Sequence, residues 1–250
     1  HIESKLTSAK NVLVVDLGGG TTDICMIRLD PTKVHELNRT QDVLSVTGAR
    51  LGGMECDKNL ITQSIAPHMG LGTQLTSGLP VPPTYYSDMC AVDDIPRLNN
   101  FFSDDYGLDI AQTMSISKQP ERLNRLLVVQ EEKLSARLVN SSRMAKELLS
   151  SQAKITLPLR YIEQDFNANM SSQDLERSMS TWLSRVKKLI VDCVSKSTAE
   201  PEMLFITGGM SLSPIVQKFV RSMFPDMAVV EGDAFNSVSE GLSIQANKMC

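Results

Sequence analysis

The pattern of apolar and polar residues near the start of the chain predicts two strands joined by a tight turn. Four β-prone apolar residues at 12–15 lead into Asp16, and a second apolar run begins at Ile24. Between them stand three consecutive glycines at 18–20, which interrupt any regular element. We therefore expect a strand, a turn and a strand over residues 12–27.

Later apolar stretches predict the other elements of an α/β pattern. Short β-prone runs predict strands at 43–46, 154–159, 203–206 and 228–230. Apolar residues at helical spacing predict helices at 57–66, one or two within 121–151, a long helix at 175–194 with Trp182 in the core, one that begins at Ser213 and Pro214, and a last one at 238–246.

Capping residues mark the starts of two predicted helices, and one long stretch shows no regular pattern. Ser171 and Asp174 have the spacing of a capping box, and Ser213 stands where an N-cap serine would precede a first-turn proline. Between residues 67 and 119 the periodicity fails, and glycine and proline recur. We expect a long, partly ordered insertion in a peripheral lobe there.

Composition places the chain among ordinary globular proteins. Its 250 residues suffice for one large domain or two modest lobes, and hydrophobic and charged fractions of 42% and 22% are typical. A formal net charge of −4 supplies no basic field for nucleic acid or an anionic membrane. No apolar run approaches the roughly 18 residues of a membrane-spanning helix. We expect neither nucleic acid nor a membrane as a partner.

Cysteine spacing and the first residues indicate the context of the chain. The five cysteines are scattered without the paired spacings of a zinc site, which favours a reduced, cytoplasmic compartment. The chain begins at His1, and Asn11 already leads into a predicted central strand. We interpret the chain as a fragment of a longer protein.

The glycine turn carries the chemistry of a phosphate site. Three glycines remove every Cβ from the turn, so its backbone N–H groups can approach a ligand closely. The flanking residues add hydroxyl groups and acceptors for a hydrated cation, namely Thr21, Thr22, Asp16 and Asp23. A plain hairpin turn is the alternative, but these polar neighbours favour a loop for phosphate and Mg²⁺.

Two other glycine motifs do not fit the turn. No Gly-Lys-Ser/Thr sequence follows it, so the Walker lysine is missing. The residues after Gly20 are β-prone rather than helical, which excludes the helix-bound pyrophosphate of a dinucleotide fold. Later glycine pairs at 52–53 and 208–209 would each bring bare backbone near a helix start, although an ordinary turn explains either one alone.

Four segments, in the order of the family, resemble motifs of the DnaK-type heat-shock chaperones of the actin-like ATPase superfamily. Residues 16–23 look like the second phosphate loop, and residues 51–57 are similar to the Gly-Gly-Glu-Asp-Phe-Asp segment. Residues 145–151 resemble the helix that contacts adenosine, and residues 206–214 resemble the adenosine loop. In combination, the sequences Gly-Leu-Gly at 70–72, Leu-Pro-Val-Pro-Pro at 79–83 and Glu-Gly-Asp-Ala-Phe-Asn-Ser-Val at 231–238 look closest to the divergent YegD-type branch.

The resemblance implies a role for each matching residue. Asp16 would bind Mg²⁺ through water, Thr21 would hold phosphate with the loop glycines, and Asp23 would orient the attacking water; these are the implied catalytic residues. Asp16 and Asp23 are also the implied metal residues. The implied contacts of ATP or ADP are Gly18, Gly19, Gly20, Thr22, Gly52, Gly53, Lys146, Glu147, Ser150, Gly208, Gly209, Met210 and Leu212.

The resemblance also implies an architecture. The chain would be an α/β lobe of the actin-like ATPase (ribonuclease H-like) fold, with a mixed five-stranded sheet, helices and an inserted α+β subdomain. Residues 10–51 and 169–250 would form the core subdomain, and residues 52–168 the peripheral one. The N-terminal lobe of the same protein, with the first phosphate loop, would be missing, so the fragment alone should hydrolyse ATP weakly or not at all.

Two departures and two alternatives accompany this interpretation. Arg143 replaces a glutamate of the family, and Leu212 replaces an arginine that stacks on adenine, so the choice of base stays open. The favoured function is the nucleotide-binding lobe of a DnaK-like chaperone ATPase, with client proteins and co-chaperones as partners. The alternatives are an actin-like filament or cell-division ATPase, and a sugar kinase or polyphosphate phosphatase of the same superfamily.

Overall fold

The computed structural model describes residues 3–36 and 38–231, and the chain divides into two compact units. His1–Met54 and Ser180–Cys250 form the first unit, and Glu55–Met179 forms the second. The subdomain boundaries implied by the resemblance stay a prediction. Among the described residues, no helix has the length and apolar character needed to cross a membrane.

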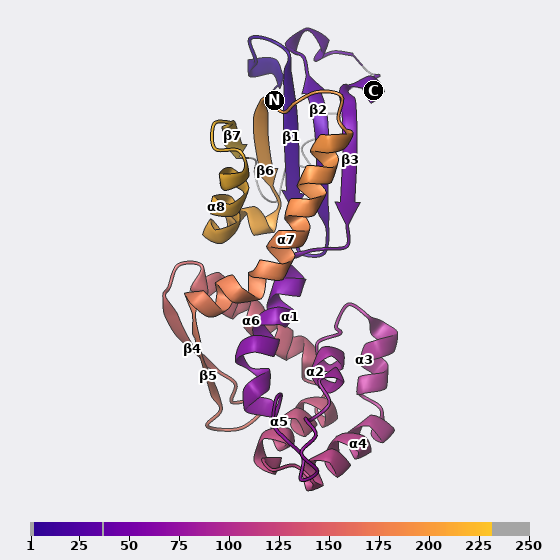
Figure 1. Ribbon diagram of the computed structural model, residues 1–250, viewed down its shortest axis with the longest axis vertical. Coiled ribbons are helices and arrows are strands. Elements are labelled where there is room, and N and C mark those ends of the chain that lie inside the picture. Colours follow the sequence, from indigo (N-terminus) through magenta and orange to yellow (C-terminus); the bar gives the residue numbers. More distant parts are fainter. Residues whose placement is uncertain (1–2, 37, 232–250) are drawn as a thin grey trace. The chain divides into compact units, whose positions relative to one another are not determined.

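A mixed five-stranded sheet forms the centre of the first unit, as predicted (Figure 1). Its strand order is β3-β2-β1-β6-β7; β2 is antiparallel to both neighbours and β6 is parallel to both of its own. The strands are β1 (Lys10–Leu17), β2 (Thr22–Leu29), β3 (Val43–Ala49), β6 (Met203–Thr207) and β7 (Ala228–Glu231). The predicted strand, turn and strand over residues 12–27 are confirmed.

The described part of the first unit contains the helix α8 (Pro214–Met223) and the later part of α7 (Ser172–Lys196). α7 crosses one face of the sheet (Figure 1), where Ser45 and Thr47 of β3 donate side-chain hydrogen bonds to its carbonyl groups. Trp182 of α7 is fully buried, which confirms it as a core residue.

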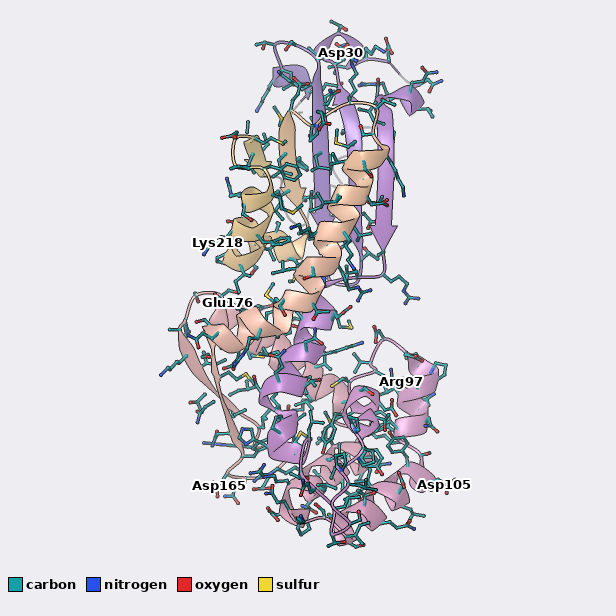
Figure 2. All side chains as sticks on the ribbon, in the orientation of Figure 1. Asp30, Arg97, Asp105, Asp165, Glu176 and Lys218 are labelled. Atoms are coloured by element: carbon teal, nitrogen blue, oxygen red, sulfur yellow. The ribbon has the colours of Figure 1, made fainter. Side chains whose placement is uncertain are left out.

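α8 connects the two parallel strands β6 and β7. It buries Val216 and Val220, whereas Lys218 projects to the outside (Figure 2). Ser213 occupies the N-cap position before Pro214, as predicted, although its hydroxyl makes no capping hydrogen bond. The predicted helix at 238–246 lies outside the described residues.

Helices and one two-stranded sheet form the second unit. The helices are α1 (Gly53–Ser64), which begins in the first unit, α2 (Thr84–Met89), α3 (Ile95–Phe101), α4 (Asp104–Ser115), α5 (Pro120–Glu131) and α6 (Ser135–Leu149). The strands are β4 (Lys154–Pro158) and β5 (Asn167–Ser171), which pair antiparallel. β5 was not predicted, because its short polar sequence buries only Ala168 and Met170.

The segment 67–119 is more regular than its sequence predicted, since it contains α2, α3 and α4. The side chains of Asp94 and Ser103 cap α3 and α4. Pro96 lies in the first turn of α3, where a proline has no intrahelical hydrogen bond to lose and therefore starts a helix rather than breaking it. α2 and α3, with 6 and 7 residues, are also too short to show helical periodicity.

The capping box at the start of α7 is confirmed. The backbone N–H of Ser171 donates to Asp174 Oδ2 at 2.8 Å, and Ser171 Oγ accepts from the backbone N–H of Asp174 at 3.3 Å. Hydrogen bonding to Ser171 holds the pKa of Asp174 below its usual value. The box thus satisfies donors that the first turn of a helix leaves without partners.

We predict that Ser171→Ala lowers the free energy of unfolding by about 1 kcal/mol, because it removes one half of the box. For a chain of this size that corresponds to a Tm lower by roughly 2–4 °C, measured by circular dichroism. Ser184→Ala is the control, since this exposed serine of α7 bonds only to a carbonyl of its own helix. Equal losses in both variants would contradict the capping role.

Candidate functional site

The register of the sheet places two carboxylates side by side. Asp16 of β1 lies directly opposite Asp23 of β2. Farther out, Asp23 pairs with Gly48 of β3, and Asp16 pairs with Thr207 of β6. Because paired residues of neighbouring strands project from the same face, these residues form one row across four strands. The carboxylates occupy the middle of the row, next to the glycine turn.

The carboxylate pair carries uncompensated negative charge. Asp16 is half-buried, Asp23 is exposed, and neither has an ion-pair partner in the described part of the chain. Burial raises the pKa of Asp16, and the charge of Asp23 raises it further. A divalent cation between the carboxylates would remove this repulsion.

The donor set of the pair fits one kind of cation better than others. Within residues 3–36 and 38–231, no group of three or more histidine, cysteine, aspartate or glutamate side chains is arranged to hold a metal. Zinc and calcium sites usually use more protein ligands than this pair offers. Mg²⁺ keeps several of its waters and is commonly bound through one or two carboxylates, so two aspartates beside an open turn fit it.

Each carboxylate lies against a glycine. A Cβ added at Gly208 would lie 2.5 Å from Asp16 Oδ1, and one at Gly48 would lie 2.7 Å from Asp23 Oδ1. Gly208 also has a φ of 85°, which favours glycine for the backbone itself. The two carboxylates therefore extend toward opposite sides of the row, each into space that a side chain would occupy.

The glycine turn between β1 and β2 is anchored at several points. The N–H of Gly18 donates to the carbonyl of Thr21 at 2.9 Å and closes the hairpin. The N–H of Gly53 donates to the carbonyl of Gly18 at 3.1 Å, and the N–H of Met54 donates to the carbonyl of Gly19 at 3.0 Å. Gly52 packs on the turn so closely that a Cβ there would lie 2.3 Å from the Gly19 carbonyl. These contacts tie the turn to the start of α1.

The packing of the chain does not require glycine at positions 19 and 20. Both are exposed, neither has a left-handed φ, and a Cβ on either would meet no atom within 4 Å. Their N–H groups find no acceptor in the described part of the chain. Because these two adjacent residues have no side chains, their exposed N–H groups form a donor array that suits an anionic group.

The two threonines after the glycines have different environments. Thr21 is exposed at the end of the turn. Thr22 is fully buried, and its Oγ1 donates to the carbonyl of Leu51 at 2.5 Å. Thr22 therefore braces the segment that leads into α1, whereas the Thr21 hydroxyl is the one beside the donor array.

Only some of the predicted site residues in the turn that follows β6 are exposed. A 3₁₀ turn at Gly209–Leu212 follows Gly208 and leads into α8. Met210 is buried, whereas Gly209 and Leu212 are exposed. Of this predicted group, Gly209 and Leu212 are the residues that solvent or a ligand can reach.

In the second unit, the predicted site residue Lys146 pairs with a carboxylate. Its Nζ lies 2.8 Å from Asp57 Oδ1 of α1, and both side chains are largely buried. Ser142 Oγ donates to the backbone carbonyl of Asp57 at 2.8 Å, so two successive turns of α6 hold this residue. Burial raises the pKa of Asp57, and Lys146 opposes that shift. Glu147 is exposed, and Ser150 Oγ donates to the carbonyl of Lys146 at 2.9 Å.

Three neighbours of the predicted site residues were not predicted, namely Gly48, Thr207 and Asp57. Gly48 and Thr207 reach the row through strand pairing, which spacing along the chain does not reveal. A signal for Gly48 did exist, because an isolated glycine within a strand often marks close approach of another group. Asp57 follows a glycine pair on α1 and meets its partner only through the packing of α6.

Comparisons with known proteins place the chain among relatives. The family model described as Hsp70 protein matches residues 108–249, which include α6 and Gly208 but not the turn between β1 and β2. The chaperone protein DnaK of Akkermansia muciniphila is 24% identical over 225 residues, which cover 86% of this chain and 26% of that protein. The chain thus spans about a quarter of the length of this curated relative.

We predict that Asp16→Asn stabilises the fold, because it removes a repelling and partly buried charge. The raised pKa means that ionised Asp16 costs stability above its folded pKa, so the gain should be present at neutral pH and vanish as pH falls below about 3.8. A gain of about 0.5 kcal/mol, or roughly 1–2 °C in Tm, is expected without added divalent cation. Calorimetric scans at pH 7 and pH 3.5 test this, with exposed Asp165→Asn as the control. A loss of stability at pH 7 would contradict the repulsion.

We predict that Lys146→Met destabilises the second unit by about 3 kcal/mol, because Asp57 keeps a buried charge without its partner. The double variant Asp57→Asn/Lys146→Met should recover part of this loss, since no unpaired charge remains. Urea denaturation measures both, and Lys154→Met, at an exposed lysine, is the control. A double variant no more stable than Lys146→Met would show that the unpaired charge is not the cause.

Proposed function

The chain belongs to the Hsp70 family, and from this premise we propose that the turn between β1 and β2 binds the phosphate groups of ATP or ADP. The observation that carries the proposal is the pair of exposed N–H groups at Gly19 and Gly20, which have no acceptor among the described residues. The chain's own packing does not require glycine there, so the space is open to a ligand. Thr21 adds an exposed hydroxyl beside these donors.

The carboxylate pair completes the proposed chemistry. Asp16 would hold Mg²⁺ through water, and Asp23 would share that shell and orient the attacking water. When bound, Mg²⁺ would neutralise part of the phosphate charge. Phosphoryl transfer needs mainly positioning and charge neutralisation, so the absence of an obvious covalent nucleophile in this row is no obstacle.

The remaining site residues divide by exposure. Gly209 and Leu212 in the first unit and Glu147 in the second are exposed, and each stays a proposed nucleoside contact. Thr22 and Lys146 have partners within the chain. We assign Thr22 a supporting role, and we propose a nucleotide contact for Lys146 only while its ion pair is kept.

For the longer protein, we propose a DnaK-like chaperone ATPase in which this chain is the second of two nucleotide-binding lobes. The similarity to a chaperone protein DnaK supports this over a filament protein or a sugar kinase. The first lobe of the same protein, client proteins and co-chaperones are the proposed partners, and the YegD-type branch is the proposed subfamily. Because the first phosphate loop belongs to the other lobe, we expect the chain alone to hydrolyse ATP weakly or not at all.

Calorimetric titration tests the proposed function. ATP, ADP and GTP, each with Mg²⁺, are titrated into the 250-residue chain and into the full-length natural protein, with Asp16→Ala as the comparison. We expect Mg²⁺-dependent binding that this substitution weakens, and the three nucleotides decide the base. No binding of any nucleotide to the full-length protein would overturn the proposal.

We predict that Gly19→Ala and Gly20→Ala leave the fold intact and weaken nucleotide binding. A methyl group fits at both positions, so Tm should stay unchanged or rise slightly. The same methyl keeps phosphate from the N–H groups, and the loss of one charge-assisted hydrogen bond corresponds to about tenfold in Kd. Gly52→Ala is the contrast, because its Cβ would meet the backbone of Gly19 and should destabilise the fold. Unchanged nucleotide affinity in both turn variants would contradict the donor array.

A further inference from the structure

We propose that Gly48 is a positioning residue that keeps the carboxylate of Asp23 apart from that of Asp16. Its consequence for nucleotide binding rests on the proposed function, whereas its effect on the carboxylates does not. Gly48 lies directly opposite Asp23 in the register of β2 and β3. It therefore closes one end of the row in which Asp23 and Asp16 stand side by side.

The Asp23 carboxylate occupies the space that a side chain at position 48 would need. A Cβ at this position would lie 2.7 Å from Asp23 Oδ1, a distance that requires a shift. The next atom, the carbonyl oxygen of Thr22, would lie 3.5 Å away, which is ordinary contact. Of the nearest atoms in the described part of the chain, the Asp23 carboxylate oxygen is thus the one that a methyl group at Gly48 would disturb.

No backbone requirement explains glycine at this position. Gly48 has no left-handed φ, and it is exposed rather than packed in the core. β3 carries exposed valines at Val43 and Val46, so this strand accommodates side chains nearby. Glycine weakens a strand interior, and the carboxylate of Asp23 is the one observed reason for its presence.

The order of the row gives the direction of the effect. β3 lies on one side of Asp23 and β1, with Asp16, lies on the other. A side chain at Gly48 would push the Asp23 carboxylate away from β3 and toward Asp16. The like charges would approach, and the gap between them would narrow. A Cβ at Gly208 would likewise approach Asp16 Oδ1, but it would also meet the backbone of Leu17, and the φ of 85° favours glycine there for the backbone itself.

A double-mutant cycle between Gly48→Ala and Asp23→Ala tests the proposal on the chain itself. Asp23→Ala removes the group that the new methyl would meet. In that background Gly48→Ala should raise Tm by roughly 1–4 °C, as alanine does at compatible glycine sites. In the native background the gain should be absent or reversed. Val46→Ala, on the same strand, is the control and should shift Tm equally in both backgrounds.

A second readout follows Asp16 directly. NMR titration of its carboxyl carbon should show that Gly48→Ala raises the pKa of Asp16 above its value in the native chain, whereas Val46→Ala leaves it unchanged. Titration of Mg²⁺ and ADP should then show an affinity about threefold weaker in Gly48→Ala, which corresponds to the cost of one closer pair of like charges. A change in affinity without a shift of the Asp16 titration would contradict action through the carboxylates.

The outcomes separate the two proposals. Equal effects of Gly48→Ala in both backgrounds, with an unmoved Asp16 titration, would overturn the positioning role. Failure of the native full-length protein to bind Mg²⁺ and ADP would overturn the proposed function, and the cycle and the titration would still decide the role of Gly48.

Discussion

Two negative charges held side by side at the ends of β1 and β2 are the constraint on which the site in the first unit depends. The hairpin register sets Asp16 opposite Asp23, and a slip of one residue would send one carboxylate to the other face of the sheet. The buried side chains of β1 and β2 prevent that slip, because the same register places Leu13, Leu17, Ile24 and Met26 in the core. The packing of the core thus imposes a repulsion at the surface. Burial raises the pKa of Asp16, and the charge of Asp23 raises it further.

Besides Gly48, the glycines around this pair serve three different physical purposes. Gly208 has a left-handed backbone, and Gly52 allows close packing on the turn. Gly19 and Gly20 show neither need, since their backbones are ordinary and the space beside them is empty. Only the last kind points to a ligand, because the first two explain glycine by the fold alone. The Gly-Gly-Gly sequence by itself is also compatible with a hairpin turn, but the open space and ordinary backbone at Gly19 and Gly20 favour a ligand site.

The parts of the fold that were predictable are those specified by neighbours in sequence. β1, the turn and β2 follow from apolar runs around glycines, and the Ser171 capping box follows from side chains three residues apart. α3 was missed because a proline was interpreted as a helix breaker although it occupies a first turn. The site divides in the same way. Asp16 and Asp23 flank one turn and were predicted, whereas Gly48 and Thr207 join them through strands distant in sequence.

The surroundings of Lys146 limit the contacts that this motif residue can make with a nucleotide. Its ammonium is paired with Asp57 in a largely buried environment, and the backbone of Asp57 is held by the same helix. A ligand that drew the ammonium away would leave a buried carboxylate unpaired, at a cost of about 3–5 kcal/mol. An ammonium has three donors, so it can contact a ligand while it keeps the ion pair. Any nucleotide contact by Lys146 must therefore be made with the Asp57 pair intact, which restricts it to the donors that Asp57 does not use.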